Sequence, residues 1–302
     1  MKLPYHLLDV FTDRPFAGNP LAVFTNGQGI SSETMQLIAK ELNLSETTFV
    51  LPPSDTANNY RVRIFTPGAE LPIAGHPTIG TTFILAKEGM VELQDGETVI
   101  QLEEGVGPLP VTIHSSGGQA DFIEMGQPLP RFGPRFDDIA GVAEMLSLEP
   151  EALAAPGLPI EVVSCGMPFL FVPIKDLAAI RRIRFRTDVW ERVLRPLETQ
   201  EVFVFTKEVE LEGSTVHSRM FAPSLGIVED PATGGASGSL GCYLVRHQVI
   251  PSDGELKCVS EQGIEMGRPS IIKIRIAHRD GEITGVRVGG HCRYMGAGHF
   301  EL

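Results

Sequence analysis

The sequence predicts an α+β protein of two similar lobes, each with a sheet wrapped around one central helix. Strand-like runs recur along the chain, two helix-length segments lack a polar face, and an internal repeat contains both of those segments. At about 150 residues per domain, 302 residues predict two domains or lobes. The 32 glycines and 23 prolines are spread out, as expected for many short strands joined by turns.

Strand candidates are frequent and helix candidates are fewer. In 60–65 the residues alternate, with Tyr60, Val62 and Ile64 on one face of the predicted strand. Apolar residues at helical spacing predict an amphipathic helix over about 32–43, which Asn43 ends. The other predicted helices are 137–147 and 187–195, and the other strands are 6–11, 21–24, 48–51, 97–102, 110–114, 169–172, 201–206, 218–221, 270–277 and 285–288.

Two further helices are apolar or built from small residues on all sides. They span 77–87, opened by Pro77 and closed by Gly89, and 233–245. A helix without a polar face is normally buried on every side. Each is therefore expected at the centre of one lobe.

An internal repeat surrounds these helices. The copies at 65–80 and 221–235 each contain a strand ending in Phe-x-Pro, then an acidic residue, then a Thr that opens the helix. Aligned on Thr78 and Thr233, Gly75 matches Asp230 and His76 matches Pro231. Chance similarity between two Gly- and Pro-rich loops is the alternative. We favour duplication because the flanking strand and helix recur as well.

Charge and composition exclude several classes of function. The net charge of −13 opposes binding to nucleic-acid phosphates and to anionic membrane surfaces. No apolar run is long enough for a signal peptide or a spanning helix, so we expect a cytoplasmic protein. The four cysteines are widely separated and without CxxC spacing, which disfavours a disulfide framework or a zinc site.

The two helix openings are candidate sites for a small carboxylate. A helix N-terminus offers backbone N–H groups and the positive end of the dipole. Glycine there lets a ligand approach the backbone, although it also simply permits tight packing. The candidate substrate-binding residues are Gly75, Thr78, Thr233, Gly234 and Gly235, together with Asn19 and Ser45.

Three side chains are candidates for proton transfer. Glu46 begins an apolar strand, where burial would raise its pKa toward a useful range; a turn in solvent is the alternative. His76 lies at a helix N-terminus that would keep it neutral, or it is structural. Asp230 transfers protons, binds substrate or caps the helix. No phosphate loop, GxGxxG or GxSxG motif is present, and we expect neither a metal nor a nucleotide cofactor.

At these residues the sequence resembles the phenazine-biosynthesis PhzF-like isomerase family. The matching stretches are 9–20, 43–49, 65–78 with Gly-His-Pro-Thr, 220–234 with Glu-Asp-Pro-Ala-Thr-Gly, 267–270 and 288–290. The resemblance implies the diaminopimelate-epimerase-like fold, with curved, mostly antiparallel sheets. It implies lobes at 1–117 plus 284–302 and at 118–283, a C-terminal strand that returns to the first lobe, and an active site in the cleft between the lobes.

The resemblance also implies cofactor-independent proton transfer on a small carboxylic acid by a homodimer. Glu46 would be the general acid/base, assisted by His76 and Asp230. One departure concerns Gly235, where the family commonly has Ser, so a hydroxyl that could bind substrate is missing. The alternatives are a non-catalytic protein that binds small acids in the same cleft and a thiol-based epimerase using Cys165 or Cys242. The latter is disfavoured because neither helix opening carries a cysteine.

Overall fold

The computed structural model describes residues 2–153, 157–195, 197 and 199–302. The chain divides into two compact units: unit 1 is Met1–Gln127 with Arg287–Leu302, and unit 2 is Pro128–Val286. The first boundary lies after 127 rather than 117, because β8 (Gln119–Gln127) pairs with β7 (Gly107–Ser116) of unit 1. The chain returns to unit 1 within β17 (Glu282–Gly290).

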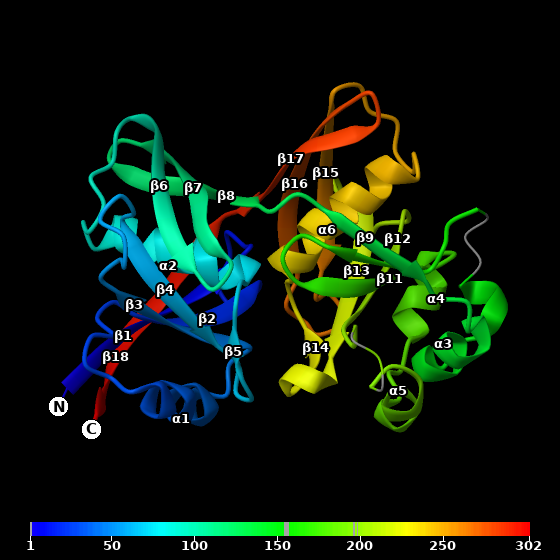
Figure 1. Ribbon diagram of the computed structural model, residues 1–302, viewed down its shortest axis with the longest axis horizontal. Helices are drawn as coiled ribbons and strands as arrows, with labels where there is room; N and C mark the ends of the chain where they lie inside the picture. The colour runs from blue at the N-terminus through cyan, green and yellow to red at the C-terminus, as the bar shows by residue number, and fades with distance from the viewer. Residues whose placement is uncertain (1, 154–156, 196, 198) are drawn as a thin grey trace. The chain divides into compact units, whose positions relative to one another are not determined.

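Unit 1 is a mostly antiparallel sheet (Figure 1). Strand β1 lies between β2 and the C-terminal strand β18, which confirms the expected return of that strand to the first lobe. The pairs β2–β3 and β4–β6 are parallel. The remaining bounds are β1 (Lys2–Val10), β2 (Asn19–Phe24), β3 (Glu46–Leu51), β4 (Tyr60–Phe65), β5 (Glu70–Leu71), β6 (Gly96–Glu104) and β18 (Cys292–Glu301).

Helix α2 (Gly75–Lys87) is the buried helix of unit 1. It contacts β1, β2, β3, β7, β8 and β18, and eleven of its residues are buried. The amphipathic helix α1 (Ser32–Leu42) buries Met35, Ile38 and Ala39 against a separate apolar cluster. Asn43 ends it in the left-handed conformation with φ of 51°, as the sequence predicts.

Unit 2 repeats this construction. Strand β10 pairs with β9 and β11, β11 runs parallel to β12, β12 antiparallel to β13, β13 parallel to β15, and β15 antiparallel to β16. The bounds are β9 (Arg131–Arg135), β10 (Glu161–Ser164), β11 (Pro168–Pro173), β12 (Val202–Thr206), β13 (Val216–Ala222), β14 (Ile227–Asp230), β15 (Glu255–Gln262) and β16 (Ser270–Arg279).

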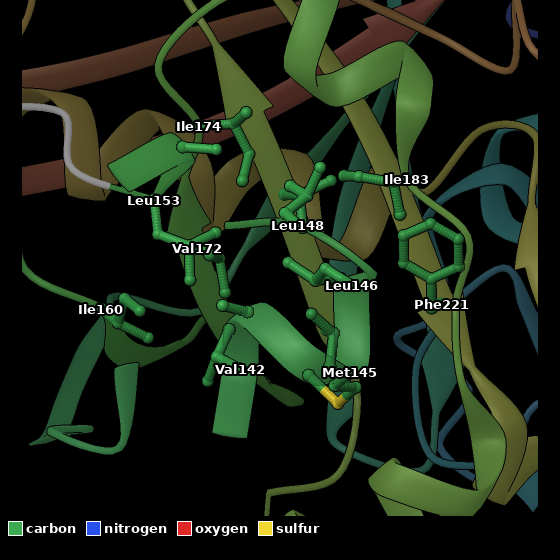
Figure 2. Packing of buried hydrophobic residues seen from close by; sticks show 14 of the residues in the cluster. Val142, Met145, Leu146, Leu148, Leu153, Ile160, Val172, Ile174, Ile183 and Phe221 are labelled. Atoms are coloured by element: carbon green, nitrogen blue, oxygen red, sulfur yellow. The ribbon is translucent and has the colours of Figure 1, made fainter. Parts of the chain in front are cut away.

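Helix α6 (Gly234–Arg246) is the buried helix of unit 2 and contacts β10, β11, β15 and β16. Three short helices, α3 (Ile139–Leu146), α4 (Leu177–Arg182) and α5 (Thr187–Val193), build a second apolar layer on this unit (Figures 1 and 2). Figure 2 shows Met145 and Leu146 packed near Val172 and Phe221. The sequence predicts α3 and α5 but not α4, which is a six-residue helix.

The pairing order supports duplication and corrects the register of the repeat. Strands β1, β2, β3, β4, β6 and β7 pair in the same senses as β10, β11, β12, β13, β15 and β16. Both central helices have 13 residues and begin at Gly75 and Gly234. Ala74 therefore matches Thr233, and His76 matches Gly235. The alignment on Thr78 and Thr233 is wrong because Thr78 lies inside its helix, whereas Thr233 precedes its helix.

No helix within the described residues is long and apolar enough to cross a membrane.

Candidate active site

Three polar side chains of unit 1 meet at one edge of its sheet. Asn19 begins β2 and Glu46 begins β3, and these strands are parallel with Leu21 opposite Glu46, so their first residues lie at the same edge. His76 is the second residue of α2. Its Nε2 lies 3.1 Å from Glu46 Oε2, and its Nδ1 lies 3.1 Å from Asn19 Nδ2. The structure thus brings together Glu46, His76 and Asn19.

Burial fixes the charge of His76. The side chain is 3% exposed, and desolvation lowers its pKa to about 3, so the ring is neutral at pH 7. The Asn19 Nδ2 group can only donate, so Nδ1 of His76 accepts and the ring proton lies on Nε2. Nε2 lies 3.1 Å from Glu46 Oε2 without meeting hydrogen-bond geometry, and the Glu46 side chain is also buried, at 7% exposed. The result is a carboxyl group and a neutral imidazole ring buried side by side.

Unit 2 places Asp230 at the end of β14, where it is 4% exposed. The Thr233 hydroxyl donates to Asp230 Oδ2 at 2.6 Å. The Gln262 amide donates to Asp230 O at 2.8 Å and to Thr233 Oγ1 at 2.9 Å, and its Oε1 accepts from Thr233 N at 3.1 Å. Asp230, Thr233 and the missed residue Gln262 thus form one network at the start of α6.

The other predicted residues differ in exposure. Gly235, in the first turn of α6, and Ser45, directly before Glu46, are partly exposed, whereas Gly75 and Gly234 are buried. Thr78 is fully buried, and its hydroxyl contacts Ala74 O at 2.6 Å as well as Glu104 Oε1. Glu104 was not predicted. Its sequence signal is a strand ending in Glu-Glu-Gly, which matches Glu-Gln-Gly around Gln262.

Residues 8–298 match the family model described as Phenazine biosynthesis-like protein. The chain belongs to this family. The expected PhzF-like isomerase family is thereby confirmed, and the α+β fold with two sheet-and-helix lobes is confirmed with it.

Relatives cover this PhzF-like chain almost from end to end. It is 36% identical over 303 residues to trans-2,3-dihydro-3-hydroxyanthranilate isomerase of Pseudomonas aeruginosa, with 99% of each chain covered. It is 36% identical over 296 residues to an uncharacterized isomerase of Mesorhizobium japonicum, with 95% of each covered. A Bacillus anthracis phenazine biosynthesis protein of the PhzF family superposes with a TM-score of 0.89 at 28% identity, with 100% of each chain covered.

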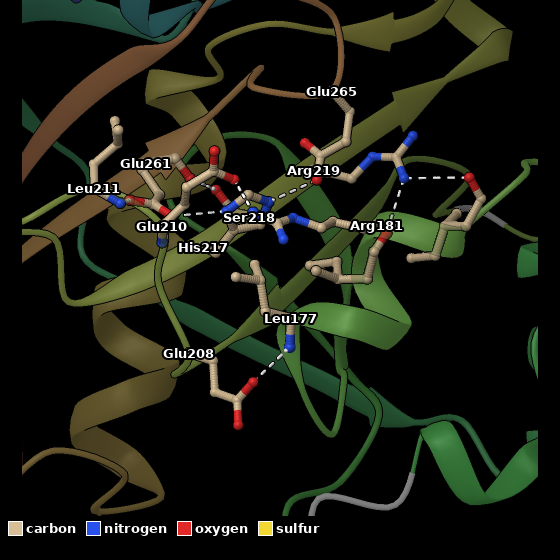
Figure 3. A network of polar contacts seen from close by, with 12 residues as sticks. Leu177, Arg181, Glu208, Glu210, Leu211, His217, Ser218, Arg219, Glu261 and Glu265 are labelled. Atoms are coloured by element: carbon tan, nitrogen blue, oxygen red, sulfur yellow. Dashed lines mark hydrogen bonds and ion pairs between the residues drawn. The ribbon is translucent and has the colours of Figure 1, made fainter.

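A charged network surrounds His217 in unit 2 of this PhzF-like chain (Figure 3). His217 Nδ1 lies 2.8 Å from Glu261 Oε1, and its Nε2 lies 2.9 Å from Glu265 Oε1. Burial alone would lower the pKa of His217, but the hydrogen bonds to the two carboxylates outweigh it and raise the pKa to about 9. Because both ring nitrogens donate, the imidazolium links β13, β15 and the loop that follows Gln262.

This network predicts a loss of stability at alkaline pH. A pKa raised from 6.5 to about 9 stabilises the fold fully below pH 6.5, and that stabilisation declines until pH 9. The decline cannot exceed about 1.4 kcal/mol per pH unit for one proton. The free energy of unfolding is measured in urea from pH 6 to 10 for wild type and for His217→Gln. The difference between the two proteins should shrink as the pH rises through this range. Parallel curves would contradict the assignment.

Cys165 and Cys242 both lie in unit 2 and contact one another. Their Sγ atoms are 3.7 Å apart, and the two side chains are 2% and 0% exposed. Their contact lowers the pKa of Cys165 and, together with burial, raises the pKa of Cys242. Thiols buried in this way do not reach a substrate, so the thiol-based alternative has no support among the described residues.

Proposed function

We propose that this chain is a cofactor-independent isomerase that moves a proton on a small carboxylic acid. Glu46 removes the proton from carbon and returns it at another position. His76, whose Nε2 lies 3.1 Å from Glu46 Oε2, and Asp230 of unit 2 assist. The amides at the starts of α2 and α6, including those of Gly75, Gly234 and Gly235, bind the substrate carboxylate and the negative charge that develops beside it.

The contact between Glu46 and His76 carries this proposal. A buried carboxyl group has few competing water molecules, and a neutral imidazole 3.1 Å away adds no charge that would hold the proton on either group. Asn19 fixes the tautomer through the opposite ring nitrogen. The arrangement therefore suits one group that both accepts and returns a proton.

The substrate class follows from the relatives and from the helix openings. One relative is named for isomerising trans-2,3-dihydro-3-hydroxyanthranilate, an unsaturated carboxylic acid. We propose an unsaturated or amino carboxylic acid here as well. Gly235 lacks the hydroxyl that the family commonly has at this position, so the carboxylate would be bound by backbone amides. The homodimer that the resemblance implies is also part of the proposal.

Proton NMR in D₂O tests the reaction directly. A panel of small unsaturated and amino carboxylates, including trans-2,3-dihydro-3-hydroxyanthranilate, is incubated with wild type and with Glu46→Gln. The proposal predicts deuterium incorporation or a shifted double bond in at least one compound, lost in the variant. Saturable binding measured by calorimetry, with every bound compound chemically unchanged, would instead indicate a non-catalytic acid-binding protein.

A further inference from the structure

Strands β6 and β15 lead into two similar triplets, Glu-Glu-Gly at 103–105 and Glu-Gln-Gly at 261–263. Each triplet contacts a loop and the segment before the central helix of its own unit. The first residue of each triplet accepts hydrogen bonds from two consecutive backbone amides of a loop. Glu103 accepts from Ser54 N and Asp55 N, each at 2.8 Å. Glu261 accepts from Glu210 N at 2.6 Å and Leu211 N at 2.9 Å. The duplication therefore extends to individual hydrogen bonds.

The third residue of each triplet is a glycine packed on the proline three residues before the central helix. A Cβ on Gly105 would lie 2.7 Å from Pro72 Cα, and one on Gly263 would lie 2.5 Å from Pro231 O. Real Cβ atoms do not approach backbone this closely. Both triplets are thus pressed against the loop that leads into the helix.

The middle residues, Glu104 and Gln262, contact the start of each central helix. Gln262 accepts from the Thr233 amide, and Glu104 Oε1 contacts the Thr78 hydroxyl in the first turn of α2. Neither central helix has a capping hydrogen bond from its own N-cap side chain, whereas Ser31, Asp138 and Asp176 cap α1, α3 and α4. At both candidate half-sites a neighbouring strand therefore contacts the start of a helix that has no cap from its own N-cap side chain.

The hydrogen bonds around Thr78 require a proton on Glu104. The Thr78 hydroxyl has one proton but contacts two acceptors, Ala74 O and Glu104 Oε1. With a protonated carboxyl, Glu104 donates to Thr78 Oγ1, and Thr78 donates to Ala74 O. Glu104 Oε2 is buried and makes no hydrogen bond within the described part of the chain, which disfavours a carboxylate further.

We propose that Glu104 is a neutral carboxylic acid that matches the Gln262 amide, and that these two positioning residues hold the helix openings of the active site. The positioning of substrate rests on the function proposed above. The protonation of Glu104 does not depend on it.

Burial favours a neutral Glu104. Desolvation raises the pKa of Glu104 to about 8, and this effect outweighs the contact with Thr78, which acts in the opposite direction. On α2 the nearest titratable group is His76, which is neutral. On β4 and β5, Arg61, Arg63 and Glu70 line a cavity of about 310 Å³ with Glu104, and Arg63 is paired with Glu70 at 2.7 Å.

Infrared spectroscopy of the full-length protein tests the protonation. The carbonyl stretch of a protonated carboxyl should be present at pH 7, disappear near pH 8 and be absent in Glu104→Gln. Glu103→Gln is the matched control and should retain the band, because hydrogen bonds lower the pKa of Glu103 to about 2. Absence of the band in wild type, or its survival in Glu104→Gln, would overturn the proposal. If Glu104→Gln does not fold, Thr78→Val serves as the test instead. Loss of the Thr78 hydroxyl must then shift the carbonyl band, and an unshifted band would also overturn the proposal.

The pH dependence of unfolding and turnover tests the positioning role. Between pH 4.5 and 8 the folded protein keeps a proton that the unfolded chain releases, so the melting temperature of wild type should fall relative to that of Glu104→Gln. Wild-type turnover should decline near pH 8, where Glu104 loses its proton. Glu104→Gln should keep turnover near the wild-type value at pH 7 and should not show this decline. Glu104→Ala should lose up to about 100-fold. Equal impairment of the Gln and Ala variants would overturn the positioning role. Absence of turnover in wild type would overturn the proposed function but leave the infrared and unfolding results valid.

Discussion

Replacing Glu46 by Gln should lower turnover by about 10²–10⁴-fold, the usual contribution of a positioned acid/base group. The amide keeps the size and most of the polarity of the carboxyl group but cannot accept a proton from carbon. Glu46 begins β3 and lies 3.1 Å from the His76 ring, so the variant should retain the strand and the neighbouring contacts. The loss should therefore appear in kcat rather than in folding.

Two controls separate chemistry from structure in this experiment. Glu41→Gln makes the same substitution at an exposed position of α1 and should leave both turnover and stability unchanged. His76→Ala should reduce turnover less than Glu46→Gln, because the ring assists the carboxylate rather than accepting the proton. Near-full turnover of Glu46→Gln would remove Glu46 from the mechanism.

Replacing Tyr243 by Ala should destabilise the protein by about 3–5 kcal/mol, the range for removing a large aromatic side chain from a core. Tyr243 lies on α6 and is fully buried. Its ring centroid is 5.3 Å from that of Phe205 in an edge-on arrangement and 6.0 Å from that of Phe171. Removing it would leave a cavity between the central helix and the sheet of unit 2.

Tyr243→Phe is the matched control because it removes only the hydroxyl group. That hydroxyl donates to Pro159 O at 2.7 Å, and burial raises its pKa, so it stays protonated. The control should cost about 1 kcal/mol, the typical net value of a hydrogen bond. Urea unfolding followed by circular dichroism measures both variants. A cost below about 1 kcal/mol for Tyr243→Ala would show that the cavity collapses and that α6 is not rigidly packed.

Local physical chemistry made much of the fold readable from the sequence. The spacing of Met35, Ile38 and Ala39 predicts α1, and Asn43 ends it as expected. The alternation in 60–65 matches β4, where Val62 and Ile64 are buried. The segments without a polar face became α2 and α6, because a helix that has nowhere to expose polar residues must be surrounded by other elements.

Other elements depend on partners that are distant in the sequence. Strand β18 is intermediate or exposed along its whole length, with no fully buried residue, yet it pairs with β1 at the opposite end of the chain. Strand β15 alternates weakly and was not predicted. The position of such a strand depends on the strands with which it pairs, so its own residues predict it only weakly.

The candidate site likewise divides into features that the local sequence predicts and features that depend on residues distant in the sequence. The sequence by itself determined Glu46, His76, Asp230 and the glycine-rich helix openings as candidates, because each residue type suits proton transfer or anion binding where it stands. Only the tertiary structure decided the contact of His76 with Glu46 and Asn19, the register of the repeat, and the places of Glu104 and Gln262 beside the helix starts. The physical reason is that strand pairing brings strand starts to one edge, and strand ends to the helix starts, through contacts that sequence periodicity does not encode.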